Sequence, residues 1–227
     1  MTKEVFYLTR NDCYKKGDAL TPRGIVLHST ATPGVMAMAF AERWNRSFEK
    51  GETSKQACVH AFVDDAGIVQ CLPWDMRGWH AGGAANDTHI GIELCEPAGA
   101  VYNRNGTAFA QYDRAALAPY FDKVWSNAVA LCAELCRTFS LDPLADGVLI
   151  CHKQAHARGI ASNHADVMHW FVQHDVTMED FCKAVADKMA QPSVRWRVQV
   201  GAFANKANAN ALLQKLRAAG FDGYVRS

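Results

Sequence analysis

Short apolar runs rich in β-branched residues recur along the chain, separated by polar or glycine-rich segments. The first, residues 23–30 (RGIVLHST), stays apolar up to His28, which is typical of a buried strand. Residues 58–64 (CVHAFVD) and 68–74 (IVQCLPW) flank Asp65-Ala66-Gly67, a sequence that favours a hairpin turn. Two further runs, 89–96 (HIGIELCE) and 147–152 (GVLICH), also predict strands.

Helical periodicity appears between these runs. Residues 35–48 and 175–189 have helical patterns, and residues 111–138 carry apolar side chains spaced for one helix face. We expect residues 79–87 to form a glycine-rich loop and residues 153–166 to form a long polar loop. Strands that alternate with helices in this order predict an α/β fold, with a mixed central β-sheet flanked by helices.

The composition changes at Gln191-Pro192-Ser193, which we interpret as a linker. Beyond it, residues 194–203, 205–220 and 221–227 have the patterns of a strand, a helix and a strand. A segment of this length is too short for an independent core without a partner. The sequence therefore predicts a main domain over residues 1–190 and a short βαβ appendage over residues 191–227.

Composition and charge narrow the class of protein. The chain has 227 residues, of which 49% are hydrophobic and 21% charged, and a net charge of +1. These values are typical of a globular protein and give no argument for a nucleic-acid partner. No stretch approaches the roughly 18–20 apolar residues of a transmembrane helix. The N-terminus is charged where a secretory leader is apolar, so we expect synthesis in the cytoplasm without a signal peptide.

The eight cysteines form no CxxC pair, and most lie within the apolar runs. We expect them to be reduced thiols that act as small core residues. Their even number would also permit disulfides, although the absence of a leader disfavours that alternative.

Histidines end two of the predicted strands, His28 in GIVLHS and His152 in GVLICH. Each alone is as consistent with a structural histidine as with a metal ligand, but the repeated context favours a metal. A hydrolytic zinc site takes three protein ligands and leaves one position open. Asp166, His164 and His169 are candidates for the third ligand, and residue chemistry does not choose among them. Asp166 could instead cap a helix.

Glu93 lies inside the apolar run IGIELC, where a carboxylate is costly unless it is paired or used. Strand alternation puts Gly91 and Glu93 on one face and Ile90, Ile92 and Leu94 on the other. Glu93 would then face a cleft as a general base. A salt bridge at the strand end is the alternative.

The set GIVLHSTATPG, CVHAFVDDAGIV, GWHAGG, HIGIELCEP, VLICHKQ and SNHADVMHWF resembles the type-2 N-acetylmuramoyl-L-alanine amidases, from about residue 20 to residue 185. These enzymes share a fold with peptidoglycan recognition proteins and occur as phage endolysins and bacterial wall hydrolases. The resemblance implies a zinc-dependent hydrolase of the amide bond between N-acetylmuramic acid and L-alanine. By position it implies zinc ligands His28, His152 and Asp166, catalytic residues Glu93 and His164, and substrate contacts His80, Trp79 and His60.

The sequence departs from the family pattern at two points. Val167 and Met168 follow Asp166 where the family has proline and glycine, and Val59 stands where some relatives have tyrosine. The second departure puts more weight on Glu93 as the base. The scheme in which His164 is the third ligand and Asp166 only orients a histidine stays open.

The tail, VQVGAFANKANANALLQKLRAAGFDGYV, resembles the first half of a sporulation-related (SPOR) repeat, a module associated with peptidoglycan. We expect an enzyme whose partner is bacterial peptidoglycan and which reaches the wall through lysis or non-standard export. A non-catalytic peptidoglycan-recognition module is the main alternative. Less favoured are a cysteine hydrolase using Cys58 or Cys151, and a glycosidase pairing Glu93 with Glu96 or Asp87.

Overall fold

The computed structural model describes residues 2–191, 199–221 and 225. The chain divides into two compact units, Met1–Gln191 and Pro192–Ser227, which are described separately. No helix in the described ranges combines the length and apolar character needed to cross a bilayer.

A six-stranded mixed sheet forms the centre of the first unit, in the order β1-β4-β3-β5-β2-β8. Its β3–β4 pair is an antiparallel hairpin, and the other neighbours are parallel. The strands are β1 (Thr2–Val5), β2 (Gly24–Ser29), β3 (Ala61–Val63), β4 (Gly67–Gln70), β5 (His89–Leu94) and β8 (Leu149–Cys151). The predicted mixed sheet is confirmed, although the sequence patterns gave no sign of β1, which is exposed at the edge.

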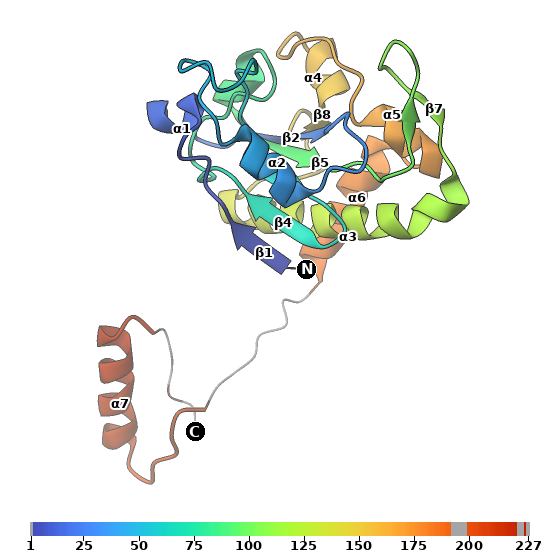
Figure 1. The fold of residues 1–227 in the computed structure, drawn as a ribbon. Coiled ribbons are helices and arrows are strands. Elements are labelled where there is room, and N and C mark those ends of the chain that lie inside the picture. Colours follow the sequence, from blue (N-terminus) through green and yellow to red (C-terminus); the bar gives the residue numbers. More distant parts are fainter. Residues whose placement is uncertain (1, 192–198, 222–224, 226–227) are drawn as a thin grey trace. The chain divides into compact units, whose positions relative to one another are not determined.

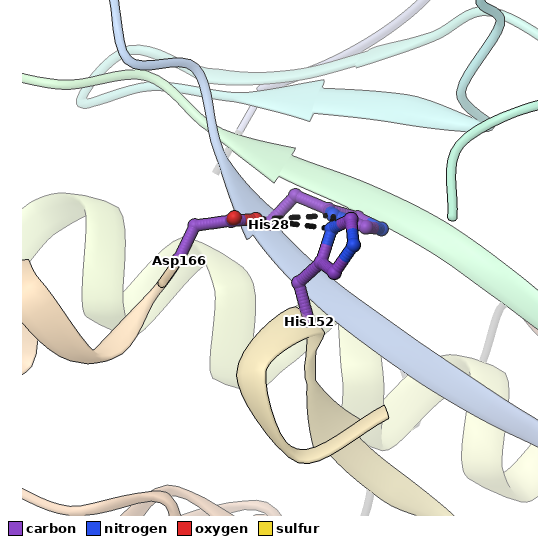
Figure 2. Close-up of side chains that lie close together, drawn as sticks. All are labelled: His28, His152 and Asp166. Atoms are coloured by element: carbon purple, nitrogen blue, oxygen red, sulfur yellow. Dashed lines mark hydrogen bonds and ion pairs between the residues drawn. The ribbon is translucent and has the colours of Figure 1, made fainter. Parts of the chain in front are cut away.

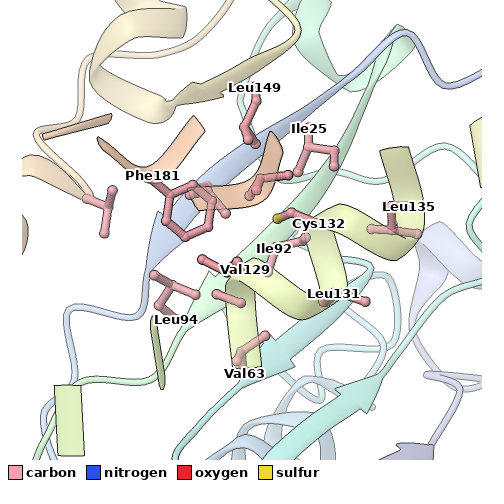
Figure 3. Close-up of a cluster of buried hydrophobic side chains, with 14 of the residues drawn as sticks. Ile25, Val63, Ile92, Leu94, Val129, Leu131, Cys132, Leu135, Leu149 and Phe181 are labelled. Carbon is pink, nitrogen blue, oxygen red and sulfur yellow. The ribbon is translucent and has the colours of Figure 1, made fainter. Parts of the chain in front are cut away.

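One face of the sheet is covered by two long helices, α3 (Arg114–Phe139) and α6 (Met178–Ala190) (Figure 1). Alternate residues of β2 and β5 point into this layer and are fully buried, as Figure 3 shows for Ile25 and Ile92. Asp113 caps α3 and Thr177 caps α6, so both helices begin within a few residues of the predicted positions. This apolar layer holds the central strands rigidly from one side.

The opposite face is divided between a second apolar cluster and a polar region. Helices α1 (Asp12–Lys16) and α2 (Ala37–Trp44) cover the β3–β4 end, where Phe62 stacks on Phe40. Helix α2 is shorter than predicted and ends at Trp44, whose carbonyl accepts a hydrogen bond from the Asn11 side chain. His28 and Glu93 lie on this second face, next to each other in the register of β2 and β5.

The segments that border this polar region are partly helical. Helix α4 (His152–Ala157) occupies part of the stretch expected to be a loop, and helix α5 (Met168–Phe171) follows that stretch. The 3₁₀ helix η1 (Ala84–Asp87) follows the glycines of the other predicted loop. Helix α4 forms because the Gln154 side chain accepts from the Cys151 backbone in a capping box. The 3₁₀ helix η2 (Val172–His174) continues α5.

A small hairpin that the sequence analysis did not predict, β6 (Val101–Tyr102) and β7 (Phe109–Gln111), lies between β5 and α3 in the chain. Tyr102 packs against Phe109, with ring centroids 4.8 Å apart, and Phe109 packs edge-on against His169 at 5.1 Å. These aromatic contacts fasten the hairpin to α5.

In the second unit, helix α7 (Lys206–Ala218) coincides with the predicted helix and is capped by Asn205. Residues 199–203 of the first predicted strand are not in strand conformation, and residues 194–198 lie outside the described residues. Most of the second predicted strand, 221–227, also lies outside them.

Candidate metal centre and catalytic cleft

Three side chains converge on the polar face of the sheet: His28 from β2, His152 from the first turn of α4, and Asp166 from the loop before α5 (Figure 2). The Nδ1 atoms of His28 and His152 lie 2.9 Å apart. Asp166 Oδ2 lies 3.2 Å from His28 Nδ1 and 3.5 Å from His152 Nδ1. The Lys153 amide donates to the Asp166 carbonyl, which ties this loop to α4. We call His28, His152 and Asp166 the three-acceptor cluster.

The proton positions in the three-acceptor cluster follow from hydrogen bonds on the far sides of the rings. His80 Nε2 donates to the His89 carbonyl at 3.1 Å, which leaves His80 Nδ1 as an acceptor. His28 Nε2 donates to that Nδ1 at 2.9 Å, so His28 Nδ1 carries a lone pair and no proton.

His152 is held in the same tautomer from another direction. Its Nε2 donates to the Ser162 carbonyl at 3.0 Å, which leaves its Nδ1 without a proton. Two bare ring nitrogens and a carboxylate oxygen therefore face one another. Burial lowers the pKa of His28, which favours this neutral form.

Asp166 stays ionised in this environment. Burial raises the pKa of Asp166, whereas hydrogen bonds from His152 and His28, which form when their Nδ1 atoms are protonated, lower that pKa well below its usual value. Three lone-pair donors at such distances repel one another unless a cation lies between them. Two imidazoles and one carboxylate are a common ligand set of catalytic zinc, so the residues present fit this metal.

Glu93 faces the same region from β5, as the strand alternation predicted. Its Oε2 atom is buried and has no hydrogen-bond partner among the described residues, which argues against the salt-bridge alternative. Burial, with smaller contributions from Asp166 and Glu96, raises the pKa of Glu93 well above its usual value. A carboxylate with a raised pKa beside a cation site is suited to general-base chemistry.

These groups line one cavity of about 190 Å³. The three-acceptor cluster and Glu93 form its floor, and the β6–β7 hairpin forms one wall through Tyr102, Gly106 and Thr107. The remaining lining residues are Ser29, Ala31, His80, His164, Ala165 and His169.

His164 is exposed at the side of this cavity, on the loop that also carries Asp166. Its Nδ1 lies 3.0 Å from Ser162 Oγ and 3.3 Å from His152 Nε2, the nitrogen that faces away from the other two acceptors. Within the described residues, the cluster with metal-ligand spacing contains Asp166 and not His164. This placement favours the scheme with Asp166 as the ligand.

The three predicted substrate contacts differ in position. His80 lines the cavity, but both of its ring nitrogens are engaged, and its ring lies over Gly91, where a Cβ atom would come within 2.4 Å. On the cavity side, its Nδ1 accepts from His28 Nε2. Trp79 packs in the second apolar cluster, beside Cys58, and does not line the cavity.

His60 has no exposed surface to offer a substrate. Its Nε2 donates to the Met76 carbonyl at 2.8 Å, and its Nδ1 accepts from the Gly91 amide at 3.0 Å. Burial lowers the pKa of His60 to about 4, so it stays neutral. The expected substrate contact is therefore corrected, because His60 is fully buried and both of its ring nitrogens are bonded to backbone groups, one of them in β5.

A second group of side chains at the cavity was not predicted from the sequence. It consists of Tyr102, Glu96 and His169, and we call it the Tyr102 cluster. The Tyr102 hydroxyl donates to Glu96 Oε1 at 2.7 Å and lies 2.7 Å from His169 Nε2. His169 Nε2 is 3.1 Å from the same carboxylate oxygen. In the sequence, this cluster is marked only by a glutamate directly before Pro97, at the end of an apolar run, and residue spacing does not indicate the partners of that glutamate.

The geometry also bears on the less favoured mechanisms. Cys58 and Cys151 are buried, and burial raises the pKa of both thiols, so neither provides a reactive thiolate. Glu96 is fully buried and engaged in the Tyr102 cluster, and Asp87 pairs with Arg77. Neither carboxylate is available as a glycosidase partner for Glu93.

Comparison with solved structures shows the same fold elsewhere. The hydrolase AmiA of Staphylococcus aureus, solved in complex with its ligand, superposes with a TM-score of 0.63 at 20% identity, over 83% of each chain. The catalytic domain of XlyA superposes with a TM-score of 0.54 at 24% identity, over 82% of this chain and 99% of that one.

Sequence comparison gives the family. N-acetylmuramoyl-L-alanine amidase XlyA of Bacillus subtilis (strain 168) is 40% identical over 101 residues, 43% of this chain and 32% of that protein. Amidase CwlH of the same strain is 36% identical over 114 residues, 48% of this chain and 43% of that protein. The chain thus matches less than half the length of these curated relatives.

A SPOR domain model matches residues 192–227, and the Amidase_2 model, described as N-acetylmuramoyl-L-alanine amidase, matches residues 18–192. The Amidase_2 match covers more than half of the chain and includes every residue of the three-acceptor cluster, so the chain belongs to the Amidase_2 family of N-acetylmuramoyl-L-alanine amidases.

Proposed function

We propose that this protein is a zinc-dependent hydrolase that cleaves the amide bond between N-acetylmuramic acid and L-alanine in bacterial peptidoglycan. The observation that carries the proposal is the three-acceptor cluster, in which three lone-pair donors face one another beside Glu93. Family membership and the relatives named as amidases support the same reaction.

In this proposal, His28 Nδ1, His152 Nδ1 and Asp166 Oδ2 hold the metal. Zinc, when bound, supplies Lewis acidity toward the scissile carbonyl and makes water easier to deprotonate. Glu93 removes the proton of the attacking water and returns it to the leaving L-alanine nitrogen. His164 donates a hydrogen bond to the oxyanion, a role suited to its exposed position beside the cavity.

Chelation followed by metal return tests the proposal. Protein dialysed against a strong chelator should lose activity on a defined N-acetylmuramoyl peptide, and one equivalent of zinc should restore it. The product carries a new L-alanine amine and no new reducing sugar, which separates an amidase from a glycosidase. Full turnover by metal-free protein would contradict the zinc site, and binding without turnover in the zinc-loaded protein would favour a recognition module.

We also propose that residues 1–190 form the catalytic domain and that residues 191–227 form a partial SPOR segment that binds peptidoglycan. The match of the SPOR model to residues 192–227 supports this division. In the described part of the tail, no side chain of α7 is buried, as expected for half of a module. We expect the enzyme to meet its substrate in the cell wall.

A chain that ends at Gln191 tests this division. It should cleave soluble muropeptides at the rate of the full chain and bind purified wall sacculi more weakly in a sedimentation assay. If the shortened chain does not fold, the tail belongs to the catalytic unit. Equal binding of both chains to sacculi would contradict a binding role for the tail.

A further inference from the structure

The Tyr102 cluster lies in the wall of the cavity and has no part in the proposed chemistry. Glu96 is fully buried at the end of β5, and Tyr102 and His169 both line the cavity. The three residues come from separate elements, the β5 end, strand β6 and helix α5. Burial of a carboxylate is unfavourable unless other groups donate hydrogen bonds to it. The groups that contact Glu96 therefore indicate where the protons of the cluster lie.

An ionised carboxylate only accepts hydrogen bonds, so the groups that contact Glu96 Oε1 must donate. Tyr102 Oη donates its single proton to Glu96 Oε1 at 2.7 Å. A hydrogen bond to a buried, charged oxygen is stronger than one between neutral groups, so this proton stays on the Glu96 side of the hydroxyl. The hydroxyl of Tyr102 therefore has no proton left to offer to a ligand.

The third member of the cluster fixes one lone pair of the same hydroxyl. His169 Nε2 lies 2.7 Å from Tyr102 Oη and 3.1 Å from Glu96 Oε1, so it faces two oxygens and carries a proton. A phenolic oxygen has two acceptor positions, and His169 fills one of them. The other remains, on a side chain that lines the cavity.

We propose that Tyr102 is a specificity-determining residue that accepts a hydrogen bond from an amide N–H of the substrate. The proposal rests on the proposed function for the identity of the substrate. Glu96 and His169 act as positioning residues, because they hold the hydroxyl in the accepting orientation. Burial, followed by the nearby Glu96 charge, raises the pKa of Tyr102, so the hydroxyl also stays neutral over the working pH range.

An N-acetylmuramoyl peptide offers this donor from two sources. One is the acetamido N–H of the sugar, and the other is a backbone N–H of the stem peptide. Both have the same chemistry, and the position of Tyr102 in the hairpin wall is compatible with either. Two substrate analogues separate them: one with acetoxy in place of acetamido, and one methylated on the backbone nitrogens of L-alanine and the next residue.

Binding should be measured by calorimetry in the Glu93→Gln background, so that the result does not depend on turnover. Tyr102→Phe in that background should raise the Kd of the N-acetylmuramoyl dipeptide about 3–10-fold, the usual value of one neutral hydrogen bond. For one of the two analogues, Tyr102→Phe should have no further effect, and that analogue identifies the source. In the otherwise wild-type enzyme, KM should rise by a similar factor while kcat changes less than twofold.

Tyr112→Phe is the matched control. Tyr112 also bonds a histidine, with its hydroxyl 2.6 Å from His174 Nε2, in the neighbouring aromatic group, but it does not line the cavity. Its loss should leave Kd and KM unchanged. Glu96→Gln should raise KM by the same factor as Tyr102→Phe. The double variant should raise KM no further, because both substitutions remove the same accepting orientation of the Tyr102 hydroxyl.

An unchanged Kd in Tyr102→Phe, or an effect that persists with both analogues, would overturn the proposal. A large fall in kcat with constant KM would also overturn it, because that result assigns Tyr102 to the chemical step. If no substrate is hydrolysed but Tyr102→Phe still weakens binding, the proposed function fails while this inference stands.

Discussion

Two clusters of histidine and carboxylate side chains border the same cavity, and they differ in where their protons lie. In the three-acceptor cluster, His28 donates outward to His80 Nδ1 and His152 donates outward to the Ser162 carbonyl, so that bare nitrogens face Asp166. In the Tyr102 cluster, a hydroxyl and a ring N–H point inward to Glu96. Histidine and carboxylate groups therefore leave three lone pairs facing one another in the first cluster, whereas in the second cluster two proton donors face one carboxylate oxygen.

Residue type and proximity alone therefore do not identify a metal site. What distinguishes the two clusters is the partner on the far side of each ring, which fixes the tautomer. Variants that act on one cluster should therefore leave the properties of the other cluster unchanged.

Loss of Asp166 should have the largest effect. Asp166→Ala should lose zinc, as measured by metal analysis of the purified protein, and its activity should fall to background. His164→Ala should keep zinc and lose about 10²–10³-fold in kcat, the usual value of one oxyanion donor. Zinc retained in Asp166→Ala but lost in His164→Ala would exchange the two roles.

Removing the base should have the next largest effect. Glu93→Gln should keep stoichiometric zinc and lose about 10²-fold or more in kcat. The wild-type rate should fall as pH drops through the raised pKa of Glu93, because a protonated carboxyl cannot accept the proton of water. This acid limb should be absent from the residual activity of Glu93→Gln. A variant within a few-fold of the wild type would assign the base elsewhere.

The orienting role of His80 should appear in metal affinity. His80→Phe keeps a ring over Gly91 but cannot accept from His28 Nε2, so zinc should bind roughly 10–100-fold more weakly in a competition assay with a chromophoric chelator. Tyr102→Phe is the matched variant from the other cluster, and its zinc affinity should equal that of the wild type. Equal affinities in all three proteins would mean that His80 does not hold the His28 tautomer.

The smallest effect concerns stability. Zinc should raise the free energy of unfolding of the wild type, by about 2.7 kcal/mol at a concentration 100 times its Kd. Tyr102→Phe should lower that free energy by about 1 kcal/mol, and by the same amount with and without zinc. Urea unfolding under both conditions measures this. A zinc-dependent difference would show that the two clusters are coupled.

The sequence was informative where function depends on local pattern. His28 at the end of an apolar run and Glu93 on the glycine face of an alternating strand were both predictable, because strand periodicity alone sets where their side chains point. The mixed sheet and the helices α3 and α6 followed from periodicity in the same way.

The roles of His60, His80 and Tyr102 were not predictable, for a different physical reason. The ring nitrogens of His60 are satisfied by backbone groups of Met76 and Gly91, which are distant in sequence. Tyr102 meets His169 only because an unpredicted hairpin folds back onto α5. Such contacts depend on tertiary structure, which residue spacing does not encode.

The pairing of His28 with Glu93 across β2 and β5 has a consequence for how this protein can change over evolutionary time. Neighbouring strands keep a spacing of about 4.8 Å set by backbone hydrogen bonds, whatever side chains they carry. The separation of His28 and Glu93 is thus set by the sheet itself and is protected from changes in the surrounding loops. Insertions in the β6–β7 hairpin or in the 158–166 loop can reshape the cavity, while His28 and Glu93 keep their separation.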